Sequence, residues 1–189
     1  MPGRVEFHGR SYEIKADFRN ILKIFGVLQG QFPEYIRWRI ALGLFFEPAL
    51  AEEDVEQGIS YLVRFLQPDG GGEAGGKLLD WQADATAIIS GVNAAAGQEI
   101  RSLPFVHWWT FLSWFHAMPP GELSTRVAIR QKRQRGEKLE PWEQEYYRQN
   151  KALIDLKPAY SQEERKEMER LNALLDRAEV VGRESPRHS

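Results

Sequence analysis

Two histidines flank the most aromatic stretch of the sequence, and a histidine imidazole is the commonest metal ligand in proteins. His107 and His116 lie nine positions apart. On one helix this spacing amounts to about 900°, so the two rings point to opposite sides and cannot hold one metal ion together. A zinc site would need carboxylates or His8 from elsewhere in the chain, and no HExxH motif is present. The sequence therefore predicts no metal site.

Three aspartates close to predicted helix starts are the candidates for acid–base chemistry. Asp17, Asp80 and Asp84 could act as paired carboxylates, but each also has a structural use as a helix cap or as an exposed residue beside one. The chain has no cysteine, and the remaining residues supply no recognisable set of nucleophile, base and oxyanion donors. We therefore predict a protein that is not an enzyme and that carries no cofactor.

A glycine-rich stretch, residues 69–76, could in principle cradle a phosphate group. It lacks the lysine and the hydroxyl of the GxxxxGK[ST] order, and no predicted strand precedes it. Ordering so many glycines costs much backbone entropy, so we predict a flexible loop over residues 68–77.

A run of basic residues is the best candidate for nucleic-acid binding. Arg126, Arg130 and Arg133 share one face of a predicted helix. Against this, glutamates follow directly at positions 137, 140, 143 and 145, and the net charge of the chain is −2. Charges of mixed sign more often form a salt-bridged face or contact a partner helix. We therefore expect a protein contact here and disfavour nucleic-acid binding.

The elements that position these residues are predicted to be mainly helical. The aromatic stretch 103–118 begins with Pro104, which suits a first helical turn, and is followed by two more prolines. We predict one buried helix over about 104–117, covered on most sides by the other segments. Apolar residues at helical spacing predict four helices before it and two directly after it, with a turn at Gly136. Alternating residues near the N-terminus predict a small β-hairpin.

The fold expected from these patterns is mostly α, a compact bundle of about seven helices with a small N-terminal β-hairpin. Residues 1–160 are expected to form a single helical domain, 161–181 a charged C-terminal helix with a narrow apolar edge, and 182–189 a disordered tail. The fourth helix is expected to start at a cap on Asp80. Six residues are predicted to form the structural core: Phe18, Phe25, Trp81, Trp109, Leu112 and Phe115.

Length and composition set the class of protein. The chain of 189 residues is long enough for one domain of ordinary size. Its first residues lack the apolar core of a signal peptide, and no apolar run reaches about 18 residues, so we expect no membrane segment. The lack of cysteine is compatible with a reducing compartment. We expect a soluble, cytosolic protein.

Three sequence blocks, in this order and spacing, resemble one known family. They are Ser11–Arg19, Leu79–Asp84 and His107–Phe111. The His-Trp-Trp-x-Phe pattern of the third block is the most specific, because tandem tryptophans after a histidine are uncommon. The family consists of small proteins of long-tailed bacteriophages and prophages that are encoded close to the tape-measure gene. The similarity covers about residues 5–160. The sequence departs from the usual pattern in the glycine-rich loop 70–76, where relatives tend to be more charged.

The resemblance implies a role in tail assembly in the cytoplasm of the host bacterium. The protein would be a chaperone that binds the long, helical tape-measure protein in several copies, with homo-oligomerisation left open. The alternative is a structural virion component, such as a head–tail connector or tail-completion protein, and a nucleic-acid binder comes third. Amphipathic helices of mixed charge can lay an apolar stripe along another helix. The residues expected to contact a partner are Trp108, Trp114, Arg126, Arg130, Arg133, Trp142 and Tyr146.

Overall fold

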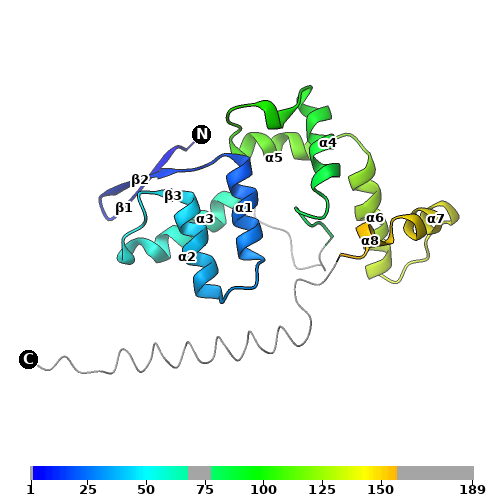
Figure 1. Cartoon of the computed structure of the whole chain (residues 1–189), viewed down its shortest axis with the longest axis horizontal. Helices are drawn as coiled ribbons and strands as arrows, with labels where there is room; N and C mark the ends of the chain where they lie inside the picture. Colours follow the sequence, from blue (N-terminus) through cyan, green and yellow to red (C-terminus); the bar gives the residue numbers. More distant parts are fainter. Residues whose placement is uncertain (1, 68–77, 157–189) are drawn as a thin grey trace, which may run out of the picture.

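The computed structural model describes residues 2–67 and 78–156 of the chain. Within these ranges the protein is mostly helical, with a small antiparallel sheet near the N-terminus (Figure 1), which confirms the predicted fold class. None of the helices in these ranges combines the length and the apolar character that crossing a bilayer requires. The predicted loop 68–77, C-terminal helix 161–181 and tail 182–189 lie outside the described residues.

The sheet has three short strands in the order β1-β2-β3. β1 (Arg4–Phe7) and β2 (Arg10–Ile14) form the predicted hairpin, and its turn places His8 and Gly9 at positive φ. A third strand, β3 (Phe46–Glu47), was not predicted, because two residues are too few to show the alternation by which strands are recognised. It pairs with the end of β2 and widens the hairpin into a sheet.

Three helices follow the hairpin close to their predicted positions. They are α1 (Phe18–Leu28), α2 (Glu34–Phe45) and α3 (Val55–Leu66). α1 packs along α2, and α2 packs on α3. β3 continues directly from the end of α2, so this helix delivers the chain back to the sheet (Figure 1).

The fourth helix, α4 (Ala85–Ala96), begins later than predicted. The Asp80 carboxylate does accept backbone hydrogen bonds from Gln82 and Ala83, at 2.9 and 2.7 Å, but these close a separate turn ahead of the helix. Trp81 therefore lies in this turn and not in α4. The predicted end is correct, since Gly97 adopts φ +68 as a left-handed cap.

The aromatic helix, α5 (Trp108–His116), is shorter than predicted. Its expected first turn is extended and pairs with the chain just before α1. The backbone N–H of Phe18 donates to the carbonyl of Val106 at 2.9 Å, and that of Trp108 donates to the carbonyl of Ala16 at 2.8 Å. This pairing places the starts of α1 and α5 side by side. His107 precedes the helix, so the expected placement of two histidines on one helix does not apply.

Three further helices end the described part of the chain. They are α6 (Glu122–Gln134), α7 (Pro141–Gln149) and the single turn α8 (Lys151–Ile154), which was not predicted. Gly136, at φ +68, lies in the predicted turn between α6 and α7. In Figure 1 these helices lie at the opposite end of the molecule from the sheet.

Aromatic rings from several helices form the centre of the core. Phe18 stacks on Phe111 with ring centroids 4.8 Å apart, and Phe111 stacks on Trp108 at 5.4 Å. These two residues of α5 are buried, while the rest of the helix is partly or fully exposed. The helix is thus covered less completely than predicted, because it packs on α4 and α1 and its remaining face is open.

Replacement of Phe111 by alanine should strongly destabilise the protein, because the ring is fully buried between Phe18 and Trp108. We expect the free energy of unfolding, measured by urea denaturation, to fall by about 3–5 kcal/mol. Phe105→Ala is the matched control: this ring is 57% exposed, and its loss should cost under about 1 kcal/mol. Equal losses in the two variants would contradict this assignment of the core.

Candidate functional site

Asp17 and His107, from the first and third sequence blocks, cap two helices at one junction. The Asp17 carboxylate accepts hydrogen bonds from the backbone N–H groups of Arg19 and Val106, at 2.9 and 3.0 Å. Nδ1 of His107 accepts a hydrogen bond from the backbone N–H of Trp109 at 3.1 Å. First-turn N–H groups have no partner within their own helix, so these side chains complete the starts of α1 and α5.

Burial lowers the pKa of His107, which is only 7% exposed. The neutral imidazole is the form that the cap requires, because Nδ1 must have a free lone pair to accept the hydrogen bond from Trp109. Across residues 2–67 and 78–156, no three side chains of the metal-binding types converge. The observed role of His107 is therefore that of a helix cap.

The tandem tryptophans at the start of α5 close the end of α3. Nε1 of Trp108 donates to the carbonyl of Leu66 at 3.3 Å, and Nε1 of Trp109 donates to the carbonyl of Phe65 at 3.1 Å. Carbonyls in the last turn of a helix lack intrahelical donors, and the two indoles supply them. The most specific sequence pattern in the chain therefore joins two helices.

Trp81, from the second block, completes the aromatic centre. Its ring stacks on Phe25 with centroids 5.6 Å apart. It contacts Trp108 edge-on at 5.7 Å and Phe115 in a tilted arrangement at 5.2 Å. All three blocks, far apart in the sequence, thus contribute to one continuous packing unit around α5.

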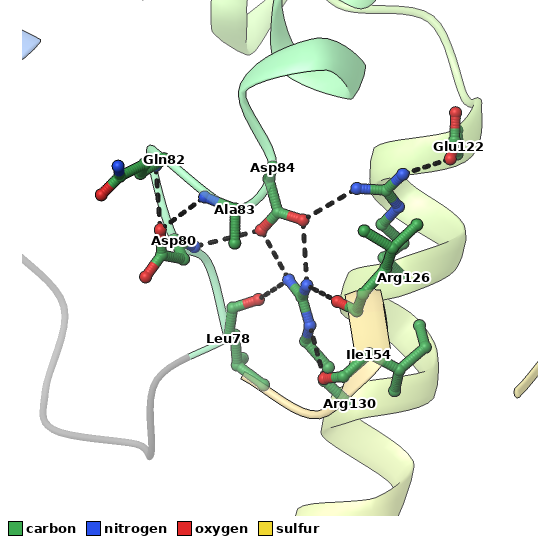
Figure 2. Close-up of polar contacts among 10 residues, drawn as sticks. Leu78, Asp80, Gln82, Ala83, Asp84, Glu122, Arg126, Arg130 and Ile154 are labelled. Carbon is green, nitrogen blue, oxygen red and sulfur yellow. Dashed lines mark hydrogen bonds and ion pairs between the residues drawn. The ribbon is translucent and has the colours of Figure 1, made fainter. Parts of the chain in front are cut away.

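Asp84, at the start of α4, is fully buried and is bound by two arginines of α6 (Figure 2). Arg130 donates to its two carboxylate oxygens at 2.7 and 2.9 Å, and Nη1 of Arg126 lies 3.2 Å from one of them. The backbone N–H of Asp80 adds a bond of 3.1 Å. Burial opposes the ionisation of Asp84, but these bonds outweigh it, and the pKa is lowered.

Arg130 uses all five of its N–H donors. Besides the two bonds to Asp84, Nε donates to the carbonyl of Ile154 at 3.1 Å and Nη1 to that of Leu78 at 2.8 Å, while Nη2 donates to the carbonyl of Leu153. The rigid, planar guanidinium suits such a fixed set of acceptors. Arg130 therefore joins α6 to α8 and to Leu78, in the segment that precedes α4.

A second buried carboxylate, Asp54, joins the hairpin to α3. It accepts hydrogen bonds from the Tyr12 hydroxyl at 2.6 Å, Nδ1 of His8 at 2.5 Å and Nη1 of Arg10 at 3.1 Å. The hydrogen bond from the Tyr12 hydroxyl is the main cause of a lowered pKa of Asp54, about 2. Burial acts in the opposite direction, and His8 and Arg10 lower the pKa further. In the sequence only the acidic run 52–54 indicates this site, and acidic residues there are also expected because they favour the positive end of a helix dipole.

These two clusters connect segments of the chain. Asp84 and Asp54 are ionised and surrounded by donors, so neither carboxylate is free to act as a general base. Asp54 holds the hairpin against the start of α3, and Asp84 holds α6 against the start of α4.

The sequence profile of the family described as Bacteriophage Gp15 protein matches residues 1–156. The chain belongs to this family. The match includes all three blocks and reaches the end of the second described range, so the junctions above lie within the family region. No curated protein and no solved structure gives a match to the chain.

The expected basic face of this family member is not formed. Arg126 and Arg130 are each 4% exposed, because the shared helix face points inward. Both pair with Asp84, and Arg126 also pairs with Glu122. Arg133 lies over the ring of Tyr147 at 4.0 Å and pairs with Asp155 at 3.4 Å. The run therefore offers no row of free cations to a nucleic acid.

The other expected contact residues differ in accessibility. Trp108 is 1% exposed, so it is a core residue and not a surface for a partner. Trp142 on α7 is 59% exposed, whereas Trp114 and Tyr146 are partly buried. Of the six residues expected in the core, Phe18 is buried. The other five are partly buried and pack against the buried core: Phe25, Trp81, Trp109, Leu112 and Phe115.

Replacement of Arg130 by lysine should destabilise the protein although the charge is kept, because an ammonium cannot satisfy five separately placed acceptors. We expect a loss of about 3 kcal/mol in the free energy of unfolding, measured by urea denaturation. Arg133→Lys, on the same helix but half-exposed, should change it by under about 0.5 kcal/mol. If Arg130→Lys lowered the free energy of unfolding no more than this control does, the structural role of the Arg130 hydrogen bonds would be refuted.

The stability of the protein should depend on Asp54 in acid. Its pKa of about 2 lies below the ordinary value of 3.8, so the unfolded chain binds more protons and stability should rise with pH. The rise is expected between about pH 2 and pH 4. Urea unfolding across this range should show a smaller rise for Asp54→Asn and a partial reduction for Tyr12→Phe, which removes one donor. An unchanged profile for Asp54→Asn would be inconsistent with the cluster.

Proposed function

We propose that this member of the Gp15 family is a non-enzymatic tail-assembly chaperone. It binds the tape-measure protein in the host cytoplasm before the tail tube polymerises. Family membership supports a bacteriophage protein. The resemblance of the three blocks to proteins encoded beside the tape-measure gene supports the more specific role.

The observation that carries the proposal is the exposure of Trp142. This ring is 59% exposed on α7, a helix whose other outward residues include Glu145 and Arg148, which pair with each other. A large aromatic ring with a charged rim is the arrangement that dominates the binding energy of many protein interfaces. The partner that fits it is an amphipathic helix with an apolar stripe.

The interior of the protein supports binding rather than catalysis. The buried carboxylates Asp54, Asp84 and Glu143 each have a cationic partner, and all serve to connect elements. Glu143, for example, holds Lys132 and so joins α7 to α6. The accessible chemistry therefore lies in surface aromatic and charged side chains.

Co-expression with the neighbouring tape-measure protein, followed by affinity capture and mass determination, tests the proposal. A soluble complex with several copies of this chain per tape measure is expected. A free protein beside insoluble tape measure would overturn it. Recovery of the chain from purified virions in ring-like copy number would instead identify a structural component.

Trp142→Ala should weaken capture of the tape-measure protein by about tenfold, corresponding to about 1.4 kcal/mol. Because the ring is exposed, thermal unfolding of the free protein should be unchanged. Phe105→Ala removes an equally exposed ring ahead of α5 and should leave capture intact. Equal capture by both variants would exclude Trp142 from the interface.

A further inference from the structure

The outer face of α2 is apolar although it is exposed. Tyr35 and Ile40 are 46% and 37% exposed, and Phe32, just ahead of the helix, is 55% exposed. At about 100° per residue, the exposed residues of the helix other than Glu34 fall within one sector, to which the half-buried Ile36 also belongs. We define the α2 face by these residues: Phe32, Tyr35, Ile36, Arg39, Ile40 and Gly43.

This face is not needed for the core, because α2 uses its opposite side for that purpose. Ala41, Leu42 and Phe45 are the buried residues of the helix. On the outer side, a Cβ added at Gly43 would meet no heavy atom within 4 Å, so another backbone can approach closely there. Within the described residues nothing accounts for apolar side chains on both sides of one helix.

The sequence of the C-terminal segment matches the α2 face in pattern. In residues 161–181, apolar side chains recur at helical spacing as Met168, Leu171, Leu175 and Ala178. This segment lies outside the family match, which ends at residue 156.

The charges of the two surfaces are complementary. Arg39 is the only charged residue of the α2 face. In the segment, Glu167 borders the apolar edge, and Glu164 lies on the line of that edge one turn ahead of Met168. A second copy of the chain is a poorer occupant, because two α2 faces packed together would bring the two Arg39 side chains into one interface.

We propose that the α2 face is the docking surface for the chain's own segment 161–181, which binds it as an amphipathic helix. Met168, Leu171 and Leu175 cover the apolar residues of the face, and the acidic side chains lie towards Arg39. Arg130 fixes Leu153 and Ile154, so the segment leaves the described structure from a defined point. The proposal is independent of the tape-measure hypothesis.

A single spin label tests this contact in the full-length protein. The natural chain has no cysteine, so Ala173→Cys, on the side of the segment opposite its apolar edge, gives one labelling site. We expect paramagnetic loss of amide signals on α2 but not on α7 in nuclear magnetic resonance spectra. Absence of a selective loss on α2 would overturn the proposal.

Two matched variants and a mixing experiment complete the test. Ile40→Glu should restore the α2 signals, whereas Phe105→Glu, the same kind of change at an exposed site elsewhere, should not. Restoration by both variants, or by neither, would contradict docking on this face. Spin-labelled chain mixed with isotope-labelled chain should show no loss; a loss there would identify a second copy as the source of the segment.

Discussion

Arg130 joins three segments that are far apart in the sequence. Its guanidinium binds the Asp84 carboxylate and three backbone carbonyls, on the turn before α4 and on α8. Burial of a cation and an anion costs several kcal/mol per ion unless every donor and acceptor is satisfied. All five donors of Arg130 have acceptors in this arrangement, so the residue helps to fix where α4, α6 and α8 lie relative to one another.

The same principle recurs where helices begin and end. Asp17 completes the start of α1 and also binds the backbone of Val106, and the indoles of Trp108 and Trp109 complete the end of α3. Helix ends that are satisfied by side chains of other elements cannot form independently of them. The stability of each helix therefore depends on its neighbours, through contacts at the helix ends as well as through the apolar faces.

Periodicity was enough to predict most helices and the hairpin, because these patterns are local in the sequence. The late start of α5 could not be predicted, since its extended approach is held by Asp17, 89 positions away from Val106. The direction in which the arginine face of α6 points could not be predicted either. Three arginines at helical spacing give the same sequence pattern whether they face solvent or a buried Asp84. The three sequence blocks contain Asp17, Asp84 and the histidine and tryptophans at 107–109, but only the structure shows that these residues cap helix ends and join elements.

The connection between α3 and α4 is anchored at both ends. The indoles of Trp108 and Trp109 bind the carbonyls of Leu66 and Phe65 at one end, and the guanidinium of Arg130 binds the carbonyl of Leu78 at the other. Both anchor points are held by residues outside that connection. Its length and composition can therefore vary without disturbing either anchor, which makes it a natural position for inserting a peptide tag or a fluorescent reporter.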